Sequence, residues 1–241
     1  MMAGLLYSAL AALGDVVGGL LVVGSSGRGR AALGALVGFG AGFMLAVALI
    51  EMTPRAMDVE YGLVAVLLGY LGVHLTQHTL TPHFHFGEET HADAMVSRGI
   101  GVYALVGLIP HSFFDGVAIT SGFLRSSELG LLIFAAIVLH KVPTGISLAS
   151  IMLASGNSRG RATAAVLLIA LATVLGGVIT PAIAPLAHYG LALAAGVTIY
   201  VAASNLIPES QHQPGWLVQG GVFVGVVAFF LVRLILPDIE P

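Results

Sequence analysis

Apolar residues are gathered along the chain into long runs, and short segments rich in glycine, serine or charged residues separate them. A helix needs about 20 apolar residues to cross the hydrocarbon core of a bilayer. On that measure the sequence predicts eight transmembrane helices, and we expect an all-α integral membrane protein with a single domain over residues 1–241. The predicted spans are residues 3–23, 32–52, 60–79, 99–123, 129–154, 162–187, 190–208 and 215–236.

The basic residues of the connections predict the orientation of the helices. Cytoplasmic connections carry an excess of lysine and arginine. One set of connections carries Arg28, Arg30, Arg98, Arg159 and Arg161, and the other carries Arg55, Arg125 and Arg233. This distribution places both termini outside and the long polar segment 80–98 in the cytoplasm, and it favours the plasma (inner) membrane as the location.

Two pairs of spans carry similar patterns. An alignment of residues 41–54 with residues 195–208 places Glu51 over Asn205 and superposes two prolines, and the fourth and fifth spans share a His-x4-Gly pattern. Spans two and seven would run in opposite directions, as in the inverted repeats of transporters. A chance match in a chain rich in alanine and glycine is the alternative.

Composition limits both the environment and the chemistry. The chain is 57% hydrophobic and 9% charged, against roughly 25% charged residues in soluble domains. We therefore expect the lipid bilayer as its surroundings and no nucleic-acid partner. There is no cysteine, so a soft metal ligand has to come from histidine or methionine.

Ionisable residues inside the fourth and fifth spans are the first candidates for a functional site. Such residues are costly in lipid and usually functional. His111 and Asp115 are four residues apart and share one helical face, and His140 supplies a second imidazole from the next span. Imidazole and carboxylate ligands suit a first-row divalent ion. A buried hydrogen-bonded pair that joins helices is the structural alternative.

Further polar residues lie in other spans or beside these. Met44 and Glu51 are seven apart on the second span and so nearly superposed along one face; packing of Met44 and an interfacial charge at Glu51 are their alternatives. Lys141 is predicted to pair with Asp115 or Glu51, or to occupy the place of a second metal ion, with a snorkelling side chain as the plain alternative. Asp15 is a candidate partner of Lys141, not a predicted metal ligand.

Histidines are concentrated around the long polar segment. A short histidine-rich tract is typical of weak, exchangeable metal binding, and a solvated polar loop is the alternative. We expect this segment to receive ions that leave the membrane path. The histidines are His74, His78, His83, His85 and His91.

The chain resembles the ZIP (Zrt/Irt-like protein) family of divalent metal transporters over nearly its whole length. The resemblance rests on the spans, on the histidine-bearing loop between the third and fourth spans, and on two motifs at residues 111–116 (HSFFDG) and 140–145 (HKVPTG). Residues 42–54 and 205–209 are also similar to the family. The resemblance implies a ZIP-like bundle with an inverted repeat.

The resemblance also implies a transport site between the second, fourth and fifth helices. Met44, Glu51, His111, Asp115 and His140 map onto that site. One helix bundle would move against another, as in an elevator, and would carry the ion inward without ATP. Asn205 is a candidate auxiliary ligand.

Many relatives in this family carry a second, adjacent metal site, and here its acids are missing. The corresponding positions read Ser112, Lys141, Thr144 and Thr180. The resemblance therefore points to a branch with a lysine in the fifth-helix motif and a single transport site.

The sequence thus predicts a transporter and not an enzyme, with Zn²⁺ as its substrate and no resident cofactor. Fe²⁺, Mn²⁺ and Cd²⁺ also fit the ligand types, and a homodimer is compatible with the sequence. The alternative is an intramembrane metal-dependent hydrolase, for which Asp115 could act as the general base although the H-E-x-x-H arrangement is absent. A carrier without a metal is the third class.

Overall fold

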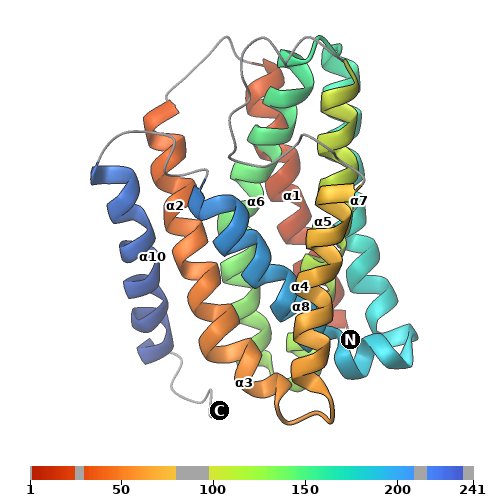
Figure 1. Ribbon diagram of the computed structural model, residues 1–241, viewed down its shortest axis with the longest axis vertical. Coiled ribbons are helices and arrows are strands. Elements are labelled where there is room, and N and C mark those ends of the chain that lie inside the picture. The colour runs from red at the N-terminus through yellow and green to blue at the C-terminus, as the bar shows by residue number, and fades with distance from the viewer. Residues whose placement is uncertain (1, 25–29, 80–97, 209–215, 236–241) are drawn as a thin grey trace.

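The fold is a bundle of long helices, seen in a computed structural model that describes residues 2–24, 30–79, 98–208 and 216–235 (Figure 1). No strand occurs among these residues, so the predicted all-α class is confirmed. The helices are α1 (Met2–Gly24), α2 (Arg30–Ala46) with the π-helix η1 (Val47–Met52) and α3 (Thr53–Ala56), α4 (Gly62–Thr79), α5 (Arg98–Arg125), α6 (Ser127–Ala154), α7 (Arg159–Ile179), the 3₁₀ turn η2 (Thr180–Ala182), α8 (Ala184–Tyr200) with the π-helix η3 (Val201–Leu206), and α10 (Trp216–Ile235).

Within the described residues, six helical stretches are long and apolar enough to cross a membrane, and two apolar helices over residues 62–77 and 220–234 are shorter. Together they account for the eight predicted spans. The predicted boundary between the sixth and seventh spans is wrong, because α7 ends at Ile179 and α8 begins at Ala184 instead of at residue 190. Two prolines decide the boundary. Pro181 lies in the 3₁₀ turn and Pro185 in the first turn of α8, where a missing backbone N–H is tolerated.

Helices α1, α5, α6 and α7 form one closely packed group, which we call the four-helix unit. Its helices meet backbone to backbone: a methyl group on Gly18 would overlap the carbonyl oxygen of Val142, and one on Gly145 would overlap that of Asp15. Glycine at such contacts lets helices approach closely, which lipid by itself does not promote.

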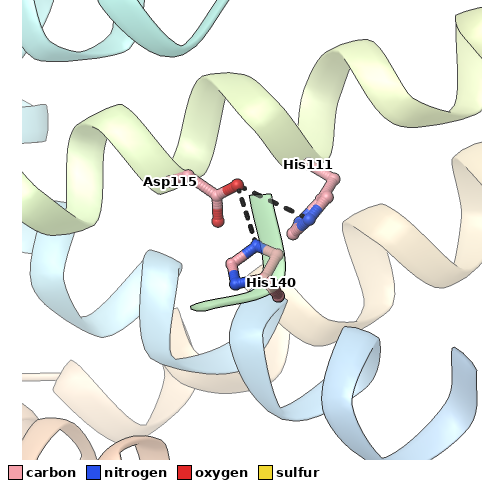
Figure 2. A group of neighbouring side chains, drawn as sticks. All are labelled: His111, Asp115 and His140. Carbon is pink, nitrogen blue, oxygen red and sulfur yellow. Dashed lines mark hydrogen bonds and ion pairs between the residues drawn. The ribbon is translucent and has the colours of Figure 1, made fainter. Parts of the chain in front are cut away.

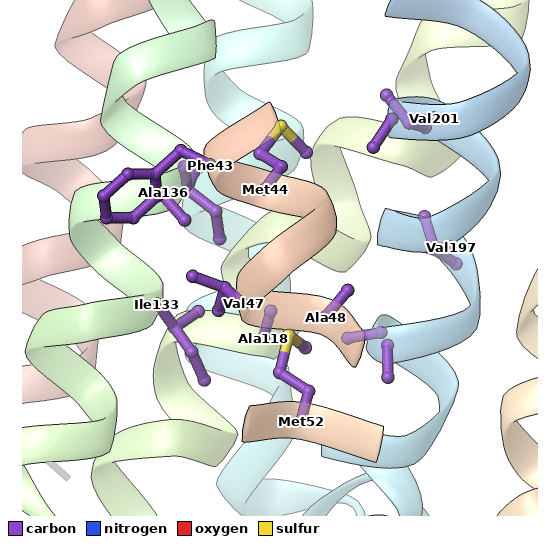
Figure 3. Packing of buried hydrophobic residues seen from close by; sticks show 14 of the residues in the cluster. Phe43, Met44, Val47, Ala48, Met52, Ala118, Ile133, Ala136, Val197 and Val201 are labelled. Atoms are coloured by element: carbon purple, nitrogen blue, oxygen red, sulfur yellow. The ribbon is translucent and has the colours of Figure 1, made fainter. Parts of the chain in front are cut away.

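The remaining helices form two close pairs, α2 with α10 and α4 with α8. An apolar cluster joins them to the four-helix unit. In Figure 3, Phe43, Met44 and Val47 of α2 and η1 pack beside Ala136 of α6 and Val201 of η3. The interface between the four-helix unit and its neighbours is therefore lined by hydrophobic side chains.

The structure supports the internal repeat. The π-helices over residues 47–52 and 201–206 differ in number by 154, which is also the shift of the alignment of residues 41–54 with 195–208. In Figure 1, α2 and α8 run in opposite directions. A π-helix is rare, so its occurrence at the same place in both halves argues against a chance match.

The repeat also extends to α1 and α7. Residues 15–19 read DVVGG and residues 173–177 read TVLGG. A methyl group on Gly18 would overlap a carbonyl oxygen of α6, and one on Gly176 would overlap the carbonyl oxygen of Phe113 in α5. Each half of the repeat therefore contributes one glycine-mediated contact to the four-helix unit.

Candidate metal centre

Three of the predicted ligands come together in the middle of the four-helix unit. His111 and Asp115 lie one turn apart on α5, and His140 reaches them from α6 (Figure 2). Asp115 Oδ2 lies 3.5 Å from His111 Nε2 and 3.4 Å from His140 Nε2. Each side chain is at most 2% exposed. One ligand atom from each residue lies within 4.8 Å of the others, and this is the group of metal-ligating side chains found in the described part of the chain.

The hydrogen bonding of His140 directs a lone pair toward this centre. Its Nδ1 lies 3.3 Å from the carbonyl oxygen of Ala136. A carbonyl oxygen only accepts, so Nδ1 carries the proton and donates it. In a neutral imidazole Nε2 is then an acceptor, and it faces the carboxylate of Asp115, which is also an acceptor. With this tautomer, a proton or a metal ion between His140 Nε2 and Asp115 Oδ2 would satisfy both acceptors.

The two separations from Asp115 Oδ2 match the geometry of a zinc site, and all three ligand atoms lie within 4.8 Å of one another. Ligands about 2.0 to 2.2 Å from a tetrahedral zinc ion lie roughly 3.3 to 3.6 Å from one another. Both distances from Asp115 Oδ2 fall in that range. The three residues therefore provide two nitrogens and one oxygen, which leaves a fourth position for water or another ligand.

Lys141 lies beside this centre and is fully buried. Its Nζ lies 3.0 Å from Asp115 Oδ2 and 3.0 Å from Asp15 Oδ2. It also donates to Thr173 Oγ1 at 2.8 Å and to Ser112 Oγ at 3.3 Å. Four oxygens from α1, α5 and α7 thus surround the ammonium. Of the partners predicted for Lys141, Asp115 is confirmed and Glu51 is wrong. Complete burial also excludes a snorkelling side chain.

The charges leave the centre attractive to a cation. Asp15 and Asp115 contribute two negative charges and Lys141 one positive charge, so the formal charge is −1 when both imidazoles are neutral. In a medium of low dielectric constant such a charge acts strongly over a few ångströms. A divalent ion would change the total from −1 to +1.

Glu51 lies outside the cluster in this structure. Its carboxylate is buried and forms ion pairs with Arg55, one turn further on, and with Arg233 Nε of α10 at 3.0 Å. It therefore links η1 to α10. Both the interfacial alternative and the role of Glu51 as a transport ligand stay predictions.

The other predicted ligands are placed as follows. Met44 is buried in the apolar cluster of Figure 3, one turn after Gly40, which lies against His140. Asn205 is part of η3, but its side chain lies outside the described residues. The ligand roles of Met44 and Asn205 therefore stay predictions.

The histidine-rich segment is mostly outside the described residues. His74 and His78 belong to α4, and the ring of His74 lies 5.8 Å from that of Tyr200. The predicted loop sites at His83, His85 and His91 fall in residues 80–97, which the structure does not describe. Their role stays a prediction.

The α7 residue that contacts Lys141 differs from the one that the sequence indicates. Thr180 was aligned with a position of the second metal site, but its hydroxyl donates to the carbonyl oxygen of Gly176, and Thr173 is the α7 residue at Lys141. The candidate pairing of Asp15 with Lys141 is confirmed. Residues 15–19 (DVVGG) align with residues 173–177 (TVLGG), and this alignment pairs Asp15 with Thr173. The repeat could therefore have identified Thr173 from the sequence.

An all-helical bundle with apolar spans and a buried His-Asp-His cluster halfway along them defines an integral membrane protein that can bind a divalent cation. Comparison with known proteins narrows this class. The family model described as "ZIP Zinc transporter" matches residues 72–233. The chain therefore belongs to the ZIP family, which consists of transporters and not of enzymes.

Individual relatives agree with this family. The chain is 29% identical to zinc transporter ZIP9-B of Xenopus laevis over 158 residues, covering 61% of this chain and 52% of the relative. It is 29% identical to zinc transporter ZupT of Enterobacter sp. (strain 638) over 253 residues, covering 95% and 96%. A third relative is zinc transporter YKE4 of Saccharomyces cerevisiae, 24% identical over 219 residues, covering 77% and 63%. The chain spans about half the length of the ZIP9 relatives and nearly all of ZupT.

Proposed function

We propose that this chain imports a divalent transition metal, foremost Zn²⁺, into the cytoplasm through a single intramembrane site formed by His111, Asp115 and His140. The observation that carries the proposal is the facing pair of acceptors, His140 Nε2 and Asp115 Oδ2, 3.4 Å apart in the middle of two spans. The three relatives are named as zinc transporters, which supports the same substrate.

The surroundings of Lys141 support a single ion. Its ammonium is held by two carboxylates and two hydroxyls, which is the oxygen environment that a hard cation would otherwise take. We infer that Lys141 stands where a second metal ion would bind. The ammonium of Lys141 is always present, whereas the occupancy of a second metal site would depend on the metal concentration.

The division of the helices supports transport by alternating access. His111, Asp115, His140 and Lys141, with their partners Asp15 and Thr173, all belong to the four-helix unit. The unit meets α2 and α8 through apolar side chains. Apolar contacts are not directional, so they can slide more easily than ion pairs or hydrogen bonds, and we infer that the unit carries the ion past α2 and α8. In another position of the unit Met44, Glu51 or Asn205 would meet the ion.

Uptake of radiolabelled zinc into sealed proteoliposomes tests the proposal. The wild-type protein is expected to accumulate zinc inside the vesicles, and the His140→Ala variant is expected to lose at least about 90% of the initial rate, because one of three ligands is removed. Thr163→Ala, a change on the exposed face of α7, is the control. Zinc-dependent cleavage of peptides without uptake would support the hydrolase alternative and refute transport. Uptake that depends on none of the three residues would refute the site.

A competition series compares the metals. Unlabelled Zn²⁺, Cd²⁺, Fe²⁺ and Mn²⁺ are added at equal concentrations during uptake. Two imidazoles favour Zn²⁺ and Cd²⁺ over the harder Mn²⁺. Stronger competition by Mn²⁺ than by Zn²⁺ would contradict zinc as the preferred substrate.

A further inference from the structure

Asp15 is a buried carboxylate that lies outside the His-Asp-His cluster but is linked to it. It belongs to α1, is completely buried, and places Oδ2 3.0 Å from Lys141 Nζ. The contact between α1 and α6 fixes this position. A methyl group on Gly14 would lie 2.8 Å from Lys141 Cβ, and one on Gly145 would overlap the backbone of Asp15. The two helices therefore lie in close contact on both sides of Asp15 and Lys141.

Asp115 Oδ2 interacts both with the His-Asp-His cluster and with Lys141. It is the atom that faces both imidazoles, and it is also 3.0 Å from Lys141 Nζ. A metal ion and the ammonium are both cations, so each weakens the hold of that oxygen on the other. The affinity of the site for metal therefore depends on how strongly Lys141 is drawn toward Asp115.

We propose that Asp15 is a positioning residue for metal binding, which holds the charge of Lys141 on the α1 side and so leaves the Asp115 carboxylate available to the ion. This inference rests on the proposed function. Without the negative charge of Asp15, the ammonium has Asp115 as its remaining carboxylate partner among the described residues, and the formal charge of the centre rises from −1 to 0.

Asp15 acts through Lys141 and not as a ligand. The ammonium of Lys141 lies between the two carboxylates, 3.0 Å from each, and Asp15 is not a member of the group of potential ligands. The hydroxyl of Thr173, which occupies the position equivalent to Asp15 in the other half of the repeat, holds the ammonium from α7. The two halves thus provide one charged and one neutral partner, and only the charged one can offset the pull of Asp115.

A double-mutant cycle tests this role. The purified full-length protein is titrated with Co²⁺, whose visible absorption reports both affinity and coordination number. The variants are Asp15→Asn, Lys141→Met and the two combined. Ser8→Ala, a buried polar change elsewhere on α1, is the matched control and should bind Co²⁺ like the wild type.

We expect Asp15→Asn to weaken Co²⁺ binding at least about tenfold, which is within the range of coupling between contacting charges. Combining it with Lys141→Met should restore the wild-type dissociation constant or a tighter one, since the formal charge returns to −1 and Asp115 is released. Lys141→Met alone leaves Asp15 unpaired. If that variant does not fold, the wild type, Asp15→Asn and the double variant can still be compared.

Two results would overturn the inference. If the double variant binds Co²⁺ as weakly as Asp15→Asn, Asp15 acts through helix packing and not through the charge of Lys141. If Asp15→Asn binds like the wild type, it has no positioning role. Both results leave zinc uptake by the wild type intact, whereas a wild type that neither binds Co²⁺ nor takes up zinc refutes the proposed function and this inference together.

Discussion

Replacement of Asp115 by asparagine is the sharpest perturbation of the centre, because it keeps the shape of the side chain and removes its charge. Asp115 Oδ2 lies within 3.5 Å of both imidazoles and of Lys141 Nζ. The variant therefore affects the ion and the ammonium together. With neutral histidines, the formal charge of the centre rises from −1 to 0 in this variant.

The size of the effect follows from the burial of the carboxylate, which is 2% exposed. Removing one partner of a buried charge pair costs about 3 to 5 kcal/mol. For a divalent ion that loses its only carboxylate ligand, that cost appears as a rise in the dissociation constant of roughly 100- to 4,000-fold, at about 1.4 kcal/mol per factor of ten. Transport at low zinc concentration should fall in proportion.

The assay is zinc binding to the purified protein in competition with a chromophoric chelator, together with uptake at several zinc concentrations. Ser121→Ala is the matched control: Ser121 is buried on the same helix, and its hydroxyl has no hydrogen-bond partner among the described residues. A dissociation constant within about threefold of the wild type for Asp115→Asn would refute the assignment of Asp115 as a ligand.

Three further predictions concern other parts of the molecule. Glu51→Gln should lower the unfolding temperature, since two arginine partners lose a carboxylate, while zinc affinity stays within about threefold; a loss comparable to that of Asp115→Asn would establish Glu51 as a ligand. Because the chain has no cysteine, single exposed cysteines report orientation: a membrane-impermeant maleimide should label Glu60→Cys but not Gly160→Cys in intact cells, and the reverse would place both termini inside. Gly145→Ala should destabilise the protein by about 1 to 3 kcal/mol through overlap with α1, measured by thermal unfolding against Gly160→Ala, where a methyl group meets open space; equal stability of the two variants would contradict the close contact.

The helices themselves were predictable from the sequence because span length depends on local composition. The pairing of His111 with Asp115 was predictable for the same reason, since residues four apart on a helix share a face whatever surrounds it. The end of α7 was not predictable from the sequence, because a proline can end, bend or begin a helix. Here Pro181 lies in the turn where α7 ends, and Pro185 lies in the first turn of α8, within one apolar stretch.

The partners of buried charges illustrate the limit of the sequence. The sequence offered Asp115 and Glu51 as partners of Lys141, with Asp15 as a further candidate, and any of them would satisfy its charge. The structure brings Asp115 and also Asp15 to the ammonium, and it directs Glu51 to Arg233 of α10. Each carboxylate carries the same charge, so charge alone does not favour one partner over another. Which of them forms depends on the helices that pack together.

The sequence by itself determined a membrane protein of the ZIP type with two imidazoles and a carboxylate in adjacent spans, because hydropathy and helical spacing are local properties. The tertiary structure decided that α1 and α7 complete the centre, that Asp15 and Thr173 hold Lys141, and that Glu51 faces the other way. The physical reason is that helices in lipid associate through the fit of their surfaces. At these contacts the fit comes from a few glycines, whose absent side chains allow the backbones of α1 and α6, and of α5 and α7, to touch.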